Sequence, residues 1–201
     1  LSLYRPGNSS DNYILNDWTK SKLNNRIDVS LERKYKYIYG KGNLKLDLKT
    51  STFGSDYDYS SVSLTAINNN KAGKLKINTR TYLQLGRGSN WANESLLGLA
   101  GANPEEMANN KFTRTNGLFS RDEFAFSHEI GNYHMGGGLN LRGYSGYLAP
   151  EYDENGNLIR NTNYGTSGAS FSAEIDFTSL IPYSVRKRGL GSSLFADAGV
   201  I

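Results

Sequence analysis

One arginine in the sequence is surrounded by glycines, in the run Met-Gly-Gly-Gly-Leu-Asn-Leu-Arg-Gly-Tyr-Ser-Gly-Tyr at 135–147. Glycine adopts backbone conformations closed to other residues and lets other atoms approach closely. We therefore expect the guanidinium of Arg142 to be held in a fixed position by its surroundings and not to be a loose surface charge. The spacing does not support a phosphate-binding loop, because there is no Gly-Lys-Ser/Thr and no Gly-x-Gly-x-x-Gly that opens an apolar helix.

Two carboxylates downstream, Glu174 and Asp197, are candidate partners for Arg142. Each lies in a segment of alternating polarity, on the face opposite the apolar side chains. In a β-barrel such polar faces point into the lumen. A loop that folds into the lumen would bring Arg142 to both carboxylates, and the planar guanidinium fork suits such a site. The alternative is three unrelated charges, each solvated.

Other candidate sites lack part of their pattern. His128-Glu129 and His134 do not have the His-Glu-x-x-His spacing of a zinc helix, and on a strand the two histidines would lie ~20 Å apart. The segment 151–156 resembles a calcium loop, but Thr162 replaces the bidentate glutamate, and its Asn-Gly pair predicts a hairpin instead. With no Cys and no recognisable Ser/His/Asp order, we expect no catalytic residue, no metal and no cofactor.

The elements that would position these groups are strands. Apolar and polar residues alternate with a period of two in about eight segments, which predicts an all-β, antiparallel fold after an irregular lead-in at 1–24. The run at 75–85 is long enough to cross a bilayer at a tilt. The segments are 26–39, 44–49, 61–66, 75–85, 111–118, 123 to the glycine run, 168–177 and 190–201.

The connections alternate in length. Those near 40–42, 68–73, 119–122 and 180–189 are mostly short, and those near 53–58, 88–110 and 143–167 are mostly long. Short turns at one rim and long loops at the other are typical of an outer-membrane barrel, so residues 25–201 are predicted to form part of a transmembrane β-barrel. Within the first long loop, Trp91–Leu99 could be a short helix, and Asn-Pro-Glu-Glu at 103–106 predicts a helix start. A two-sheet sandwich is the alternative.

Composition agrees with a two-faced β protein. The chain of 201 residues has 37% hydrophobic residues, yet 14 Tyr, 8 Phe and 22 Gly. Its 23 basic and 19 acidic residues are too balanced for a nucleic-acid-binding protein. The largest basic cluster, at 186–188, is interpreted as a solvated turn. No apolar run approaches the ~20 residues of a membrane helix, and there is no signal peptide. Because the sequence begins without Met and ends inside an expected strand, we expect a piece of a longer protein.

Three motifs in order resemble the BamA-like barrels of the bacterial surface antigen superfamily. Leu141-Arg142-Gly143-Tyr144 resembles the family's arginine-glycine-aromatic motif. Gly168-Ala-Ser-Phe-Ser-Ala-Glu174-Ile-Asp-Phe resembles its next strand. Ser193-Leu-Phe-Ala-Asp197-Ala-Gly199-Val resembles the following strand, with its phenylalanine-x-aspartate-x-glycine signature. The resemblance covers 135–201, about a third of the chain, and the earlier residues match only in style.

The resemblance implies a sixteen-stranded outer-membrane barrel, of which this chain would hold about the middle eight strands. It also implies a lumen-inserted loop whose motif, Arg142, Gly143 and Tyr144, is latched by Glu174 and Asp197. That latch would be structural or gating, so this segment would not be an enzyme. The implied partners are outer-membrane lipid, substrate proteins and accessory lipoproteins, and the implied role is protein insertion or translocation at the outer membrane.

Two other functions stay open. Relatives in Bacteroidota fuse a similar barrel to a periplasmic aminopeptidase-like domain, and the phrase Asn-Pro-Glu-Glu-Met at 103–107 together with the run at 135–147 resembles that branch. The chain would then belong to the membrane anchor of a larger exported enzyme. The periplasmic repeats of the family's assembly factors are not visible in this sequence. The third possibility is a small closed eight-stranded barrel with a structural role.

Overall fold

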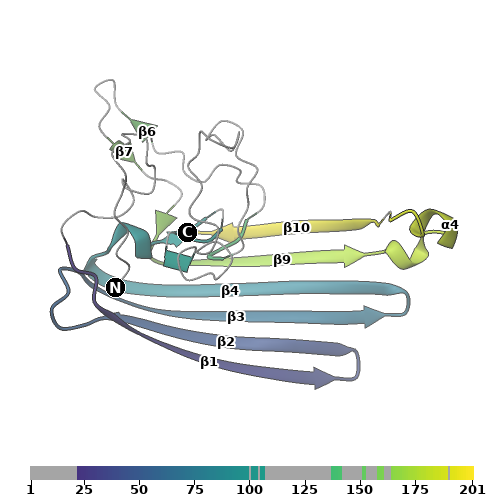
Figure 1. The fold of residues 1–201 in the computed structure, drawn as a ribbon, viewed down its shortest axis with the longest axis horizontal. Coiled ribbons are helices and arrows are strands. Elements are labelled where there is room, and N and C mark those ends of the chain that lie inside the picture. Colours follow the sequence, from purple (N-terminus) through teal and green to yellow (C-terminus); the bar gives the residue numbers. More distant parts are fainter. Residues whose placement is uncertain are drawn as a thin grey trace. The chain divides into compact units, whose positions relative to one another are not determined.

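A computed structural model describes residues 22–99, 101–103, 105–106, 137–141, 151–152, 158–160, 164–189 and 191–201. Its main feature is a six-stranded sheet in the order β1-β2-β3-β4-β9-β10 (Figure 1). The prediction of a mostly antiparallel β fold is confirmed, and among the described strands the sheet is open, with β1 and β10 at its edges. The strands are β1 (Arg26–Tyr37), β2 (Gly40–Ser51), β3 (Asp58–Ala72), β4 (Leu75–Asn90), β9 (Gly168–Asp176) and β10 (Ser193–Val200).

The chain divides into two compact units. The first, called here the loop unit, contains Leu1–Arg26, Ser51–Tyr59 and Gly88–Gly165. The second, called the sheet unit, contains Ile27–Thr50, Ser60–Arg87 and Thr166–Ile201, and so holds most of each strand of the large sheet.

The alternation of the sequence sets the two faces of the sheet. In the register of β9 with its neighbours, Ser172 pairs with Arg80 of β4 and with Asp197 of β10, whereas Phe171 pairs with Thr81 and Ala198. Directly paired residues share a face. One face is therefore lined mainly by polar side chains and the other by apolar and small ones, as the period of two predicted. Phe195 is an exception, since it pairs with Glu174 on the polar face and is 54% exposed.

The apolar face is the exposed one. Leu85 is 62% exposed, Phe171 49% and Leu194 67%, while Ser170 on the polar face is 4% exposed and Gln84 is 8%. A water-soluble sheet that packs one face into a core buries its apolar face, so the burial here is inverted. The same arrangement holds on β1 to β3, where the exposed apolar side chains are Ile27, Val29, Leu31, Leu44, Leu48, Val62 and Leu64.

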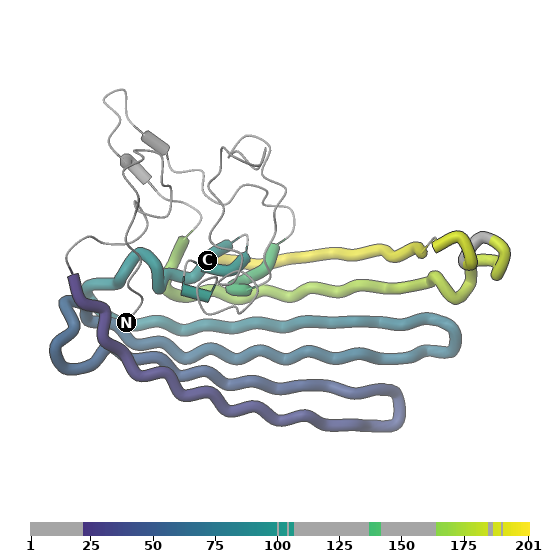
Figure 2. The backbone as a smooth tube through the Cα atoms, viewed as in Figure 1, coloured from purple at the N-terminus to yellow at the C-terminus, as the bar shows by residue number. Residues whose placement is uncertain are grey.

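Turns at one end of the sheet are short. Residues 38–39 join β1 to β2 and residues 73–74 join β3 to β4. Figure 2 shows these two reversals at the same end as the β9–β10 connection. That connection contains a 3₁₀ turn, η2 (Thr178–Leu180), and α4 (Tyr183–Arg186), after which Lys187 and Arg188 are exposed in a turn. The predicted solvated turn at this basic cluster is confirmed for those two residues.

The expected order of neighbouring strands is wrong at one place. Consecutive hairpins would pair 75–85 with the strand expected at 111–118, but β4 pairs directly with β9, from Lys76 opposite Asp176 to Gln84 opposite Gly168. The expected strands at 111–118 and from 123 lie outside the described residues. The register leaves β4 no free edge on the β9 side over this length, so the long connection between them adds no strand there.

The loop unit contains short elements. They are η1 (Asn93–Ser95), β5 (Leu97–Gly98) paired with β8 (Tyr164–Gly165), and β6 (Glu151–Tyr152) paired with β7 (Leu158–Arg160). The β6–β7 pair confirms the hairpin predicted around the Asn-Gly dipeptide. The helix considered at Trp91–Leu99 forms only the single turn η1.

The predicted helix start at Asn103 is confirmed. The Asn103 side chain accepts a hydrogen bond from the backbone N–H of Glu106 (2.9 Å), and the Glu106 carboxylate accepts one from the N–H of Asn103 (3.0 Å). These reciprocal bonds form a capping box, which satisfies two backbone donors that a helix end leaves unpaired. Glu105 and Glu106 have helical backbone conformation.

No helix within the described ranges is long and apolar enough to span a membrane.

Candidate functional site

The structure brings Glu174 and Asp197 to the same face of neighbouring strands. Asp197 of β10 pairs with Ser172, and Glu174 lies two residues along β9 from Ser172. The two carboxylates are therefore diagonal neighbours, with Cβ atoms about 7–8 Å apart or slightly less. Both side chains are partly buried. The predicted placement of both acids on the polar face is confirmed.

The other three predicted latch residues, Arg142, Gly143 and Tyr144, lie outside the described residues. Their contact with Glu174 and Asp197 stays a prediction. The candidate metal site at His128, Glu129 and His134 also lies outside.

Arg80 is a charged residue on this face that the sequence did not single out. It pairs with Ser172 from the β4 side, so Arg80, Ser172 and Asp197 form one row across β4, β9 and β10. The Arg80 guanidinium lies 5.0 Å from the centre of the Tyr82 ring. A cation over an aromatic face is attracted to the ring, which fixes the direction of the arginine side chain. The alternation at 75–85 placed Arg80 on the polar face, but only the β4–β9 register could bring it to these acids.

Ser172 is the buried centre of that row. It is 8% exposed, and its hydroxyl has no hydrogen-bond partner among the described residues. A buried polar group without a partner costs free energy, so this position favours a further donor or acceptor nearby. Together, Glu174, Asp197 and Ser172 offer acceptors that match a guanidinium.

A hydrogen-bonded pair fixes the strand next to the row. The Tyr82 hydroxyl donates to Gln84 Oε1 (2.7 Å), and Gln84 Nε2 donates to the backbone carbonyl of Thr166 (3.1 Å). The backbone N–H of Gly86 donates to Ser167 Oγ (2.9 Å). These bonds tie the end of β4 to the residues that lead into β9. They therefore fix the register that places Arg80 beside Ser172.

The turn end of the same face carries an exposed ion pair. Lys76 Nζ donates to Asp176 Oδ2 at 3.2 Å, and the backbone N–H of Thr178 donates to Asp176 Oδ1 at 2.8 Å. Hydrogen bonds from the Thr178 side chain and backbone, followed by Lys76, lower the pKa of Asp176 from 3.8 to about 2. Asp176 lies beyond the apolar residues of β9, at the turn.

The glycine run was interpreted as the end of a strand, and this is wrong for its described part. Residues 137–141 form a turn in the loop unit, with positive φ at Gly138 (50°) and Asn140 (57°). Leu139 and Leu141 are buried, and their N–H groups donate to the carbonyls of Gly98 (3.1 Å) and Leu99 (3.2 Å). Positive φ interrupts the extended conformation that a strand needs.

The glycines in this turn give clearance, as expected, but toward the loop unit. A Cβ at Gly138 would come within 2.7 Å of the carbonyl oxygens of Gly98 and Gly101. A Cβ at Gly137 would lie 2.6 Å from a Glu106 carboxylate oxygen. Side chains at these positions would therefore push the turn away from residues 98–106.

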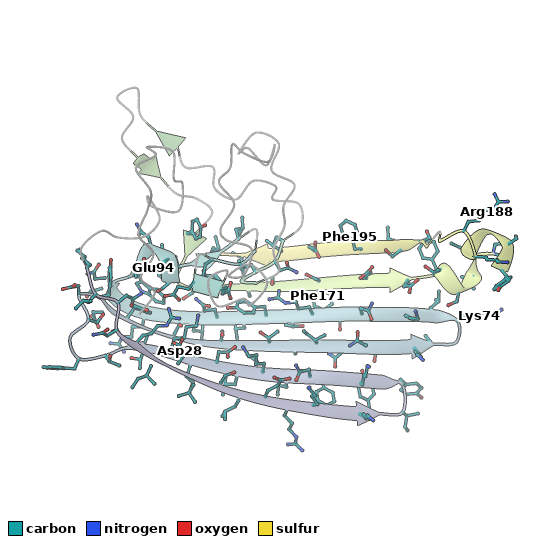
Figure 3. The ribbon with its side chains drawn as sticks, viewed as in Figure 1. Asp28, Lys74, Glu94, Phe171, Arg188 and Phe195 are labelled. Carbon is teal, nitrogen blue, oxygen red and sulfur yellow. The ribbon has the colours of Figure 1, made fainter. Side chains whose placement is uncertain are left out.

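A second group of charged residues lies in the loop unit and was missed from the sequence. We call it the Glu94–Glu105 cluster; Figure 3 labels Glu94. Both carboxylates are buried, and Arg26 forms an ion pair with Glu105. The full cluster is Asn24, Arg26, Tyr59, Glu94, Ser95 and Glu105.

Hydrogen bonds link the members of this cluster. Asn24 Nδ2 lies 3.1 Å from Glu94 Oε1 and 3.3 Å from Glu105 Oε1. The Tyr59 hydroxyl donates to Asn24 Oδ1 (2.9 Å), and Ser95 Oγ donates to Glu105 Oε1 (2.5 Å). Its members come from four places in the sequence, so no local motif predicted it. We interpret the cluster as structural, because Arg26, Asn24 and Ser95 contact Oε1 atoms of these carboxylates, while Glu94 Oε2 is buried with no hydrogen-bond partner among the described residues.

Among the described residues, no group of three or more His, Cys, Asp or Glu is arranged to hold a metal ion. Comparison with known proteins finds no family model that matches the chain and no curated protein with significant similarity.

Proposed function

We propose that this chain is part of a BamA-like outer-membrane β-barrel that inserts or passes proteins at the outer membrane. The observation that carries the proposal is the inverted burial of the sheet: its apolar face is exposed and its polar face is the more buried one. Lipid is the environment in which such a face is stable, because transmembrane barrels alternate apolar-out and polar-in.

Two further observations support it. The short turns 38–39 and 73–74 lie at one end of the strands, which is the loop sorting of outer-membrane barrels. Near that end, the apolar face of β1 carries the rings of Tyr35 and Tyr37, whose centres are 6.0 Å apart. The Tyr35 hydroxyl donates to Asn68 Oδ1 (2.5 Å) across Gly42 of β2, where a Cβ would overlap the Tyr35 ring. Aromatic residues at the border of the apolar band are a feature of these barrels.

In the proposed mechanism, the loop that carries Arg142 enters the lumen, and its guanidinium binds Glu174, Asp197 and the unpartnered hydroxyl of Ser172. Arg80 lies on the same face, and its positive charge offsets part of the negative charge of these two acids. The latch closes or opens the lumen and does no chemistry on a substrate.

The test is membrane insertion of matched arginine variants on β4. Leu83 lies on the exposed apolar face and Asn78 on the polar face, opposite Glu174. In lipid, Leu83→Arg should lower the free energy of unfolding by about 2–4 kcal/mol, and Asn78→Arg by less than about 1 kcal/mol. In a water-soluble protein the two variants would behave alike, because Leu83 is already 41% exposed.

Fractionation gives a second measurement. The chain should sediment with outer membranes and migrate differently on gels when it is not heated. Recovery in the soluble fraction without detergent would contradict the proposal.

A second candidate is the membrane anchor of a larger exported enzyme, which the phrase at 103–107 favours. The sequence encoded upstream of Leu1 distinguishes the two: periplasmic repeats support translocation, and a zinc-binding helix motif supports the enzyme anchor.

A further inference from the structure

A basic pocket of about 510 Å³ lies near the turn between β1 and β2. Its lining side chains include three lysines and two asparagines: Lys34, Lys36, Lys41, Asn43 and Asn69. By strand alternation these five lie on the polar face, and Lys41 pairs directly with Asn69. The volume falls within the range of small-molecule sites.

The pocket places like charges side by side. Because a two-residue turn joins β1 to β2, Lys36 and Lys41 are opposite each other across the hairpin. Like charges directly opposite on neighbouring strands are destabilising. Within the described part of the chain no carboxylate lines the pocket, and the nearest recorded acid, Glu32, lies 3.9 Å from Lys34. An anion between the ammonium groups would remove this repulsion.

Asn43 gives the pocket a second kind of recognition. Its Oδ1 is buried and has no hydrogen-bond partner among the described residues. An amide oxygen is only an acceptor, so it calls for an N–H or O–H donor from a ligand. An anion alone does not supply one, but an ester with a hydroxyl or ammonium group beside its charge does.

We propose that this pocket binds a phosphate ester that carries a hydroxyl or ammonium donor, the chemistry of a phospholipid headgroup and of a soluble phosphorylated alcohol. Lys36 and Lys41 hold the phosphate, with Lys34 at the rim, and Asn43 Oδ1 accepts the donor. The inference stands apart from the proposed barrel function, because every lining residue belongs to the sheet unit.

The experiment titrates the folded chain, in a detergent without phosphate, with three probes: inorganic phosphate, methyl phosphate and O-phosphoethanolamine. O-Phosphoethanolamine should bind most tightly. Lys36→Gln and Lys41→Gln should each weaken its binding about tenfold, since each removes a charge-assisted contact. Asn43→Ala should lower the affinity for O-phosphoethanolamine only to that for methyl phosphate. The matched control is Lys74→Gln, because Lys74 is an exposed lysine at the β3–β4 turn (labelled in Figure 3) that does not line the pocket.

Amide shifts of Asn43 and Asn69 in the unchanged protein give a readout that does not depend on variants. They should move on addition of O-phosphoethanolamine. Competition by phosphatidylethanolamine vesicles would assign the site to lipid headgroups, and its absence would assign it to soluble esters. No binding, an equal loss in Lys74→Gln, or equal affinity for methyl phosphate would overturn the proposal.

Discussion

Glu174 and Asp197 lie close enough on one face for a single guanidinium to reach both, and Arg80 occupies the neighbouring strand. If Arg142 reaches this face, two guanidinium groups, those of Arg80 and Arg142, would lie near the two carboxylates. Arg80 is fixed on β4 over the Tyr82 ring, while Arg142 belongs to a long connection. Loss of Arg142 should therefore release the loop without unfolding the strands.

Arg142→Ala should make the 143–167 connection sensitive to protease. In a double-mutant cycle, Arg142→Ala and Glu174→Gln should show a coupling of about 1.5–3 kcal/mol, the range of hydrogen bonds to charged groups. Arg188→Ala, in the exposed turn after α4, serves as the control. Unchanged protease resistance, or a coupling free energy near zero, would contradict the proposed contact between Arg142 and Glu174.

Asp176 should titrate unusually low for an exposed carboxyl. Its pKa is lowered from 3.8 to about 2, first by Thr178 and then by Lys76. Because the folded value is the lower one, the ionised carboxyl stabilises the fold above pH 3.8, and this contribution disappears as the pH falls toward 2. A carboxyl ¹³C NMR titration should give a midpoint near 2. Thr178→Val should raise the midpoint more than Lys76→Gln, and the reverse order would contradict the assignment.

At the scale of elements, the sequence predicted the faces of the strands and the helix cap, because both depend on residues close together in the chain. The alternation at 75–85, 168–177 and 190–201 gave the faces of β4, β9 and β10, because a strand turns successive side chains to opposite sides. Asn103 was recognised as a cap because the capping residue and its partner are three positions apart. The pairing of β4 with β9 was missed, since nothing local in either strand selects its neighbour.

The Glu94–Glu105 cluster also could not be predicted from the sequence, because its members are distant in the chain. Arg26 and Glu105 are far apart in sequence, and each looks like an ordinary surface charge. In the structure the Arg26 side chain is 16% exposed and that of Glu105 is 5% exposed. Only the folded loop unit makes this pair, so its energetic role had no sequence signal.

Glu105→Ala should lower the free energy of unfolding by about 3–5 kcal/mol, because it removes the carboxylate that pairs with the largely buried guanidinium of Arg26. The matched pair is Glu32 and Lys34, whose side chains are 45% and 82% exposed. Glu32→Ala should cost no more than about 1 kcal/mol. Denaturant unfolding measures both, and equal costs would show that the buried pair contributes nothing special.

At the scale of the whole molecule, the described sheet has a paired centre and two open edges. β2, β3, β4 and β9 have neighbours on both sides, whereas β1 and β10 have one each. Nearly all of β1 is exposed. Amides that point away from the only neighbour of an edge strand have no backbone acceptor within the sheet.

Hydrogen exchange should follow this order. In the isolated chain, β2, β3, β4 and β9 should be the most protected, and alternate amides of β1 and β10 should exchange fastest. Mass spectrometry or NMR of the folded chain measures it. If every amide of β1 and β10 is protected as strongly as those of β4, the edges are covered by another copy or another segment, and dilution would tell the two apart.

The pairing of β4 with β9 also affects the order in which the strands of the sheet assemble. Gln84 bonds to the carbonyl of Thr166, 82 positions later in the chain, while two residues join β1 to β2 and β3 to β4, and residues 52–57 join β2 to β3. Closing a long loop costs more entropy than closing a hairpin, and contacts that are distant in sequence form slowly. During synthesis the four-stranded meander can assemble while the later half is still being made. The β9–β10 hairpin is made later, so the β4 edge stays unpaired, and open to wrong strand pairing, until that hairpin docks.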